Sequence, residues 1–190
     1  MAKIILNSII KHMTRGVLVK ASELEKIVSY EKTNNEYLKL TNLENGAITG
    51  EMQYLTTIQD NFKKYCVQNN NLIISKIGYP KKVVVAQIEE NENILVSGNM
   101  FILELDLDKV DPFYLASYFT GAEGQQKLLE SSVGNFVSSI VTTKLKAMEI
   151  DLPDMDKQKE IGKKYFDTVT KIAELKSELA ANIEKLGNLS

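Results

Sequence analysis

DKQKEIGKKYFDTVTKIAELKSELAANIEKL, residues 156–186, contains no proline and predicts one long helix. Its apolar positions recur at steps of three and four, which is close to the heptad spacing of paired helices. The residues of this stripe are Ile161, Tyr165, Val169, Ile172, Leu175, Leu179, Ile183 and Leu186. A helix over 156–186 would be about 45 Å long, which exceeds the width of a small domain. We therefore expect the stripe to pair with another long helix.

The rest of the chain offers no second long amphipathic segment that could be this partner. A second copy of the chain would supply one, so the stripe predicts intermolecular pairing. The alternative, in which the helix folds back on the sheet of its own domain, stays open.

Before Pro153 the sequence shows short strands separated by Gly, Asn and Asp. Asn45-Gly46 is a tight-turn signal, and Asp111-Pro112 is typical of a helix start. The pattern predicts an α+β fold with a small curled mixed or antiparallel sheet, short helices, and a long C-terminal helix. We divide the chain into a domain over 1–153 and a helix over 154–190. The expected strands cover 36–41, 72–77, 82–88, 94–96 and 100–105, and the expected short helices cover 112–119, 122–130 and 142–148, with a loop at 131–135 and a strand-like 149–153.

Composition argues against several classes of chemistry. The chain has one cysteine, Cys66, and one histidine, His12, so an internal disulfide, a zinc site and a Ser-His-Asp triad are not expected. No apolar run is long enough to span a membrane, and the N-terminus does not resemble a signal peptide. We expect a cytoplasmic binding module without catalytic activity, metal or cofactor.

Acidic patterns in the chain do not fit metal-dependent chemistry. Asp154 and Glu174 are spaced as in some nucleases, but Glu174 would lie inside the long helix, far from Asp154. The residues from Asp106 onward resemble a calcium loop, but its sixth position is Asp111 rather than Gly.

The charge is uneven although the formal net charge is only −2. Residues 1–20 and 61–82 carry basic side chains and no acid, whereas residues 83–112 are mostly acidic. A nearly neutral chain can therefore present a basic face. Arg15 is the only arginine, so bidentate arginine contacts to guanine must be few.

Four stretches in this order resemble the specificity (S) subunits of type I restriction–modification systems. They are EYLKLTNLENGAI (36–48), NNLIISKIGYPKKVVVA (70–86), the stretch from Ser97 to Asn135, and KLKAMEIDLPDMDKQKEI (144–161). The sequence departs from the family at Asn71, where Asp is usual, and the segment 1–30 shows no clear family opening.

The resemblance implies a DNA target recognition domain followed by a conserved long helix. Full S subunits carry two such domains and two helices paired antiparallel, so this chain resembles a half-length form. It implies a homodimer, or pairing with a second half S subunit, that reads a bipartite palindromic site in double-stranded DNA. It also implies a DNA adenine methyltransferase subunit as a partner, together with a motor-nuclease subunit in some systems.

We expect the contacts to DNA to come from polar groups on predicted loops. Lys76, Lys81 and Lys82 flank the Gly78-Tyr79-Pro80 turn and are candidates for phosphate contacts, and Tyr79 is a candidate for stacking or wedging. The candidates for base contacts are Asn42, Asn45, Ser97, Asn99, Ser132 and Asn135. Two other interpretations remain open: a coiled-coil adaptor that does not bind DNA, and a truncated regulator of a restriction–modification complex.

Overall fold

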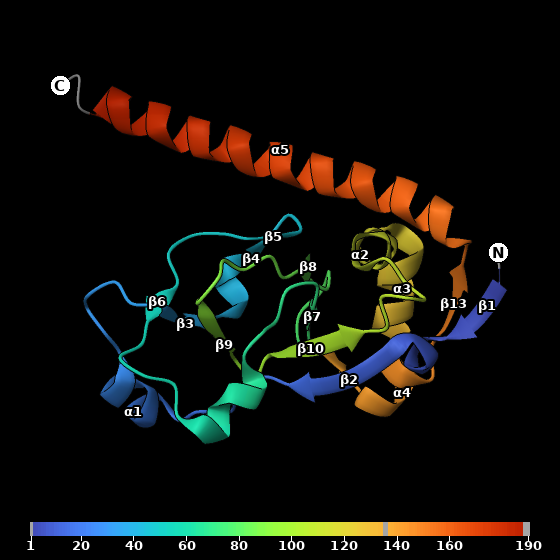
Figure 1. The fold of residues 1–190 in the computed structure, drawn as a ribbon, viewed down its shortest axis with the longest axis horizontal. Helices are drawn as coiled ribbons and strands as arrows, with labels where there is room; N and C mark the ends of the chain where they lie inside the picture. Colours follow the sequence, from blue (N-terminus) through green and yellow to red (C-terminus); the bar gives the residue numbers. More distant parts are fainter. Residues whose placement is uncertain (1, 135–136, 188–190) are drawn as a thin grey trace.

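The long helix α5 spans Met155–Gly187 in the computed structural model, which describes residues 2–134 and 137–187. Figure 1 shows α5 lying along one side of a body of small sheets and short helices. At 1.5 Å per residue, α5 is about 50 Å long. The prediction of one uninterrupted helix after Pro153 is confirmed.

The central sheet has four antiparallel strands in the order β2-β10-β7-β8. Every residue of β7 and β8 is buried, as expected for β-branched and leucine-rich runs covered on both faces. These strands confirm the predictions made for residues 72–77, 82–88 and 100–105. Their bounds are Ile10–Arg15 for β2, Met100–Leu105 for β10, Leu72–Ser75 for β7 and Val83–Val85 for β8.

A second, three-stranded sheet has the order β6-β3-β9, in which β3 runs parallel to β9 and antiparallel to β6. Its strands are Gln53–Tyr54, Asn35–Leu38 and Asn93–Val96. Nearby, β4 (Leu43–Glu44) and β5 (Ala47–Ile48) form a hairpin. Its turn holds Asn45 and Gly46 at φ values of 48° and 82°, so the predicted Asn-Gly turn is confirmed.

The N-terminal segment up to residue 30, to which the sequence assigned no structure, belongs to the fold. Strand β1 (Ala2–Ile5) pairs with β13 (Glu149–Leu152) directly before α5, and β2 forms an edge of the central sheet. The remaining short elements are η1 Leu6–Ile9, α1 Ala21–Leu24, η2 Glu25–Ile27, η3 Leu40–Asn42 and η4 Asp60–Tyr65.

Three short helices cover the central sheet: α2 (Pro112–Thr120), α3 (Ala122–Glu130) and α4 (Thr142–Lys146). Asp111 caps α2 by accepting a hydrogen bond from the Tyr114 backbone N–H at 2.7 Å, as the sequence predicts. The segment expected to be a loop at 131–135 instead contributes strand β11 (Ser132–Val133), which pairs with β12 (Ser139–Ile140).

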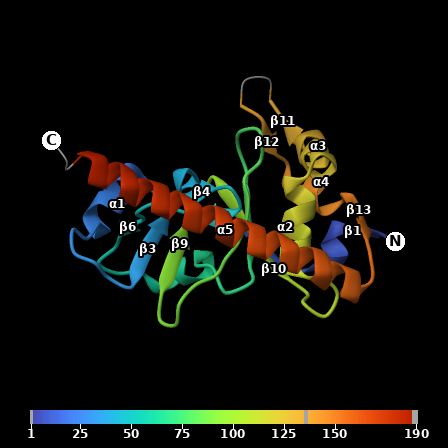
Figure 2. The same cartoon turned by 90° about the horizontal axis from the view of Figure 1, so that it is seen from above.

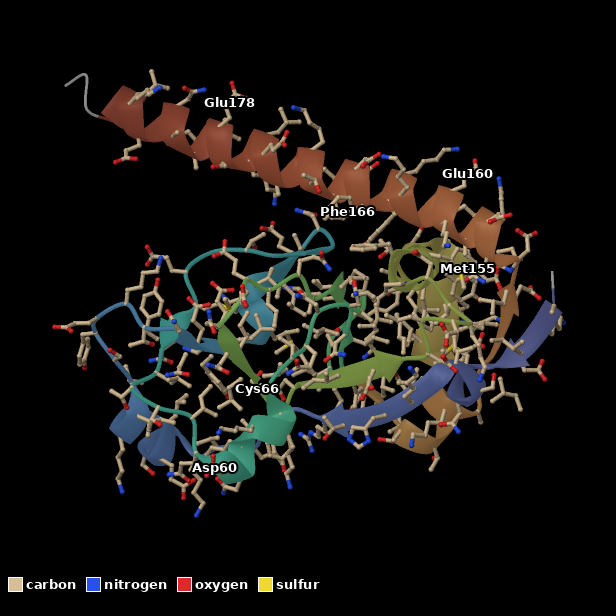
Figure 3. The ribbon with its side chains drawn as sticks, viewed as in Figure 1. Asp60, Cys66, Met155, Glu160, Phe166 and Glu178 are labelled. Atoms are coloured by element: carbon tan, nitrogen blue, oxygen red, sulfur yellow. The ribbon has the colours of Figure 1, made fainter. Side chains whose placement is uncertain are left out.

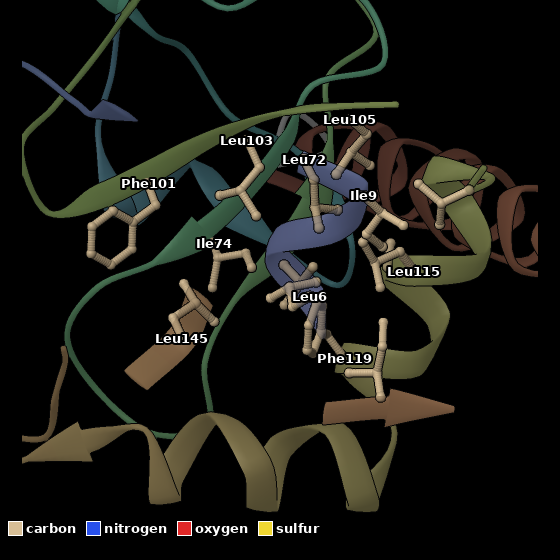
Figure 4. Packing of buried hydrophobic residues seen from close by; sticks show 14 of the residues in the cluster. Leu6, Ile9, Leu72, Ile74, Phe101, Leu103, Leu105, Leu115, Phe119 and Leu145 are labelled. Carbon is tan, nitrogen blue, oxygen red and sulfur yellow. The ribbon is translucent and has the colours of Figure 1, made fainter. Parts of the chain in front are cut away.

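The largest apolar cluster lies between the central sheet and the short helices. Leu6, Leu72, Phe101, Leu115 and Phe119 are almost completely buried in it (Figure 4). Two smaller clusters lie around β9, one of them centred on Leu38 and Val96. The α+β fold with short helices and a long terminal helix is therefore as predicted.

The first half of α5 packs on α2 of its own domain, contrary to the expectation that the whole stripe faces a partner. Ile161 and Tyr165 are partly buried against the main cluster, and Phe166 makes an edge-to-face contact with Phe113 at 5.0 Å between ring centroids. Figure 3 shows Phe166 directed toward the domain, and Glu160 and Glu178 directed away from it. The expectation failed because the short helix α2 provides a surface on which the first half of α5 packs. The sequence shows no second long amphipathic segment, so this surface was not expected.

Two residues hold the start of α5 in place. Gln158 is only 2% exposed, accepts a hydrogen bond from the Asp111 backbone N–H at 3.0 Å, and donates one to the Pro153 carbonyl at 2.9 Å. Gly162 lies so close to Asp111 that a Cβ atom there would overlap the carboxylate Oδ1. The direction of α5 is therefore fixed by the cap of α2.

Among the described residues, no helix is both long enough and apolar enough to cross a membrane.

Candidate nucleic-acid interface

Four segments far apart in sequence meet at one end of the central sheet. They are Arg15, the 76–80 loop after β7, the 97–99 turn between β9 and β10, and the β11–β12 hairpin, and we call them the loop cluster. Figure 2 shows the hairpin and the 76–80 loop projecting together to one side of α5.

Backbone hydrogen bonds join these segments. The Lys76 N–H donates to the Asn99 carbonyl at 2.7 Å, the Ile140 N–H to the Lys76 carbonyl at 2.9 Å, and the Gly78 N–H to the Ser138 carbonyl at 3.1 Å. Because three loops are bonded to one another, the cluster forms one surface rather than separate flexible loops.

Lys81, expected to contact phosphate, lies inside the cluster and is only 3% exposed. Its Nζ donates to the backbone carbonyls of Ser138 at 2.8 Å and Lys76 at 3.2 Å. Burial, together with the nearby charge of Lys76, lowers the pKa of Lys81 to about 8. Lys81 is therefore buried, contrary to the expectation of a phosphate contact at the surface. Its ammonium joins the hairpin to the 76–80 loop and is not presented to solvent.

Gln125 of α3 holds the backbone of Lys81 from the other side. The Lys81 N–H donates to Gln125 Oε1 at 2.7 Å, and Gln125 Nε2 donates to the carbonyls of Lys81 at 2.8 Å and Phe119 at 2.7 Å. Both polar ends of this buried side-chain amide are thus satisfied. The loop cluster is therefore anchored to the helices under it.

Lys76 and Arg15 provide the positive charge of the cluster. Arg15 Nε donates to the Gly98 carbonyl at 2.5 Å, and Lys76 Nζ donates to Ser139 Oγ at 2.5 Å. Burial and the charge of Arg15 lower the pKa of Lys76. Within the described part of the chain, neither side chain has a carboxylate at ion-pair distance. Arg15 was not among the DNA contacts predicted from the sequence, although it lies in the run 1–20, which carries basic side chains and no acid.

Tyr79 and Asn99 are the exposed candidates of the loop cluster. Tyr79 is 59% exposed beside Pro80, to which it is joined by a cis peptide bond. Asn99 is also exposed, at the tip of the turn between β9 and β10. The structure therefore brings Lys76, Tyr79 and Asn99 together, as a shared interface requires.

Lys82 points away from the loop cluster because neighbouring residues of an extended chain face opposite sides. Its Nζ donates to the Leu40 carbonyl at 3.1 Å, next to the β4–β5 hairpin. Asn45 is exposed at the tip of that hairpin, on the side of the domain that α5 covers. These two candidates form a separate surface.

Three further candidates for base contacts support the fold instead. Asn42 is buried, where its side chain accepts from the Lys39 N–H and donates to the Thr49 carbonyl. Ser97 is buried beside the Tyr37 hydroxyl. Ser132 is partly buried, and its hydroxyl donates to the Leu128 carbonyl at 2.8 Å. Short polar side chains commonly satisfy turn and helix-end backbone groups in this way. Asn135 lies outside the described residues.

A second basic surface lies on the outer face of β2. It is a groove of about 430 Å³ whose lining includes Lys11, Lys63, Lys64 and Asn70, together with Glu104 and apolar side chains of β10. Part of its charge is neutralised, because Lys63 pairs with Asp60 at 2.8 Å and Lys11 lies 4.0 Å from Asp106. The loop cluster is therefore the less compensated of the two basic surfaces. Residues 2–134 and 137–187 contain no group of three or more His, Cys, Asp or Glu side chains that could hold a metal ion.

The second half of α5 has its apolar stripe exposed. The exposed fraction rises from 36% at Ile172 to 67% at Leu186, and Leu175, Leu179 and Ile183 lie between these values. On the side facing the domain, Lys176 Nζ lies 2.6 Å from Glu44 Oε1, and this ion pair lowers the pKa of Glu44. The helix thus presents a continuous apolar surface that its own domain leaves uncovered.

Solved structures of type I restriction–modification proteins share this fold. One, from a study of the structural basis of complex assembly and conformational transition of the type I R-M system, has 16% identity and a TM-score of 0.63, with 99% of this chain and 43% of that chain covered. The S subunit of M. genitalium has 17% identity and a TM-score of 0.61, with 96% and 41% covered. The HsdS subunit of Thermoanaerobacter tengcongensis has 15% identity and a TM-score of 0.57, with 93% and 39% covered. This chain therefore spans about two-fifths of the length of these structures.

The sequence model of the type I restriction modification DNA specificity domain matches residues 17–185. The chain belongs to this family, as the order of its four motifs indicated. Family membership supports a role in DNA specificity. No curated protein sequence matches the chain.

Proposed function

We propose that the chain reads DNA sequence for a type I restriction–modification system through the loop cluster. The observation that carries this proposal is the pair of uncompensated cations, Arg15 and Lys76, held beside exposed Tyr79 and Asn99 on rigidly joined loops. Phosphate binding needs unpaired positive charge, and base reading needs side chains held in a fixed position.

Each exposed group has a distinct task in this proposal. Arg15 and Lys76 contact phosphates and set the position of the domain on the duplex. The amide of Asn99 matches the donor and acceptor pattern of adenine in the major groove. Tyr79 packs against a base or sugar at the edge of the contact. Lys81 and Gln125 act indirectly, by keeping these loops together.

Residues 1–153 form the recognition domain in this proposal, and the helix over 154–190 joins two such domains. A second copy could pair with the first in antiparallel orientation through the exposed part of the stripe. The two loop clusters would then be related by a twofold axis. Such a dimer would read a bipartite palindromic site. The chain would direct a DNA adenine methyltransferase subunit, and in some systems a motor-nuclease subunit, without performing catalysis itself.

The test is DNA binding by electrophoretic shift at several salt concentrations, with and without the methyltransferase subunit. Arg15→Gln combined with Lys76→Gln removes both charges and keeps polar groups at both sites. We expect weaker binding to all sequences and a salt slope reduced by about 1–2. Lys163→Gln combined with Lys185→Gln, on exposed positions of α5, is the matched control and should bind as the wild type does.

The adaptor interpretation rests on the same exposed stripe of α5. It predicts a dimer that binds neither random nor genomic DNA, even together with the methyltransferase. A double variant that binds DNA with an unchanged salt slope would instead exclude the loop cluster as the contact surface.

A further inference from the structure

Exposed apolar side chains outside α5 gather around the loop cluster. In the part of the chain that the structure describes, Leu18, Tyr79, Val133 and Val137 are each more than half exposed. Leu18 lies so close to Gly98 of the cluster that a Cβ atom on this glycine would overlap it. The other large apolar side chains exposed outside the helix are Ile5, Tyr30 and Leu107. Apolar surface concentrated beside unpaired cations is typical of a site that contacts a partner.

The β11–β12 hairpin has an inner and an outer face. Ser132 lies opposite Ile140, and Val133 lies opposite Ser139. Ile140 is only 1% exposed and belongs to the main apolar cluster, so its pair faces the domain. Because successive residues of a strand point to opposite faces, Val133 and Ser139 face outward.

The outer face of the hairpin holds a cation beside Val133. Lys76 Nζ donates a hydrogen bond to Ser139 Oγ at 2.5 Å. Residues directly opposite each other in an antiparallel pair have Cβ atoms about 4.5–5.5 Å apart. The side chain of Val133 therefore lies next to the residue that holds the Lys76 ammonium. A DNA phosphate bound by Lys76 would bring the neighbouring bases toward Val133.

The hairpin itself is uncharged and held in place. The sequence from Ser131 to Thr143 contains no charged residue. The Val141 N–H donates to the Ser131 carbonyl at 2.8 Å, and Ser138 accepts from the buried Lys81 Nζ. The position of Val133 is thus fixed by bonds at the base of the hairpin, as discrimination between bases requires.

The size of the hairpin selects the groove of DNA that it fits. A two-stranded ribbon fits the major groove, which is about 12 Å wide, whereas the minor groove is only about 6 Å wide. Figure 2 shows that the hairpin projects from the domain rather than lying across it, so it can enter a groove. The bases are therefore read from their major-groove edges.

The chemistry of valine selects the base. A serine hydroxyl can donate or accept, so serine contacts discriminate weakly between bases. Valine has no hydrogen-bonding atom, and the one apolar group on the major-groove edges is the C5 methyl group of thymine. Against any other base, valine would exclude water from polar atoms without replacing their hydrogen bonds.

We propose that the β11–β12 hairpin enters the major groove and that Val133 reads the C5 methyl group of a thymine in the target. This inference rests on the proposed function and names a base that the loop cluster selects. Lys76 positions the hairpin through the phosphate, and Val133 discriminates.

The test compares thymine with deoxyuridine, which pairs identically but lacks the methyl group. Target sequences are first selected from random-sequence DNA duplexes with the full chain, with and without the methyltransferase subunit. Each thymine of the selected sequence is then replaced in turn by deoxyuridine. We expect at least one replacement to weaken binding of the wild type about four-fold, as for the loss of one buried methyl group.

Val133→Ser assigns this effect to the valine. The variant should bind the selected sequence about four-fold more weakly than the wild type and lose nothing further with deoxyuridine. Tyr30→Ser, at a fully exposed residue next to β6, is the control and should keep both the affinity and the methyl sensitivity. Thermal unfolding checks each variant. Val133→Thr keeps the branched shape that strands favour and one of the two methyl groups, so it should lose part of the sensitivity even if Val133→Ser is unstable.

The other outcomes separate the two proposals. Absence of sequence-specific binding by the wild type would overturn the proposed function and this inference together. Specific binding without a methyl-sensitive thymine would overturn this inference alone. Methyl sensitivity that persists in Val133→Ser would also overturn it, because another side chain would then read the methyl group. A defect of Val133→Ser that appears only with the methyltransferase and is equal on thymine and deoxyuridine would indicate a protein contact instead.

Discussion

The Nζ atom of Lys81 lies 2.8 Å from the backbone carbonyl oxygen of Ser138, although the two residues are 57 positions apart in the sequence. This hydrogen bond joins the β11–β12 hairpin to the loop after β7. The loop cluster therefore depends on a buried cation that itself does not reach the surface.

Replacing this cation should loosen the cluster. Lys81→Met keeps much of the length of the side chain but removes the charged donor to the carbonyls of Ser138 and Lys76, which then keep only their backbone N–H donors. We expect a loss of about 1–3 kcal/mol in the free energy of unfolding, measured by urea denaturation. DNA affinity should fall as well, and Lys82→Met, at an exposed neighbour outside the cluster, should change stability by less than about 0.5 kcal/mol. Equal effects of the two substitutions would contradict the role of Lys81 in joining the β11–β12 hairpin to the 76–80 loop.

The pH dependence of the free energy of unfolding should also report the burial of Lys81. Because the pKa of Lys81 is lowered to about 8 from 10.5, the folded state binds fewer protons than the unfolded state between these values. Stability therefore rises with pH through this window. We expect the free energy of unfolding of the wild type, minus that of Lys81→Met, to increase by about 1–3 kcal/mol between pH 7 and pH 10. A flat difference would show that the ammonium of Lys81 is not destabilised by burial.

Tyr79 should contribute to DNA binding without contributing to the fold. Tyr79→Ala removes an exposed ring, so the free energy of unfolding should stay within about 0.5 kcal/mol of the wild-type value. Loss of a packing contact of about 1 kcal/mol would weaken DNA binding about five-fold. The salt slope should not change, because the ring carries no charge. A reduced slope would mean that the substitution had displaced Lys76 or Arg15.

Gly162 should tolerate no side chain. In Gly162→Ala the new methyl group would overlap the Asp111 carboxylate, which caps α2. Although Ala favours a helix by about 1 kcal/mol, overpacking at this contact should cost more, and we expect a net loss of about 1–3 kcal/mol in thermal or urea denaturation. Lys163→Ala, at the next position and on an exposed face, is the control and should lose no more than about 0.5 kcal/mol. A Gly162→Ala variant more stable than the wild type would show that α5 does not pack closely against Asp111.

Leu179 should be required for the dimer and dispensable for the domain. Leu179→Lys removes two leucines from each proposed dimer, which corresponds to about 3 kcal/mol and about a 100-fold weaker association. Sedimentation measures this, and unfolding of the domain should be unaffected. Glu178→Lys introduces the same side chain at the preceding position, outside the stripe, and should leave association intact. Equal loss of association in both variants would point to charge rather than to the stripe.

Local signals explain why much of the fold could be predicted. The cap at Asp111, the turn at Asn45-Gly46 and the stripe of α5 each depend on residues a few positions apart. By contrast, β1 pairs with a strand from the opposite end of the domain, with Ala2 opposite Leu152, and β2 pairs with β10, with Arg15 opposite Phe101. Such pairing leaves no mark within the segment 1–30, so its role could not be read from its own sequence.

The candidate site was predicted less completely for a similar reason. Lys81 and Lys82 are adjacent and chemically identical, and only the packing of the distant β11–β12 hairpin decides which of them is buried. Asn42 and Ser97 carry side chains that can hydrogen-bond to bases, yet both are buried within the domain. The sequence therefore locates the loops but not the roles of the individual side chains within them.

The pairing of β1 with β13 places Ala2 near the foot of α5, while Gly187 lies at the far end of the helix, about 50 Å away (Figure 1). Fluorophores attached at these two ends of one molecule would therefore be separated by about the length of α5. In an antiparallel assembly, the helix tip of one molecule lies alongside the helix of the other. Mixing donor-labelled and acceptor-labelled molecules would then report subunit exchange in real time, with no substitution in the stripe itself.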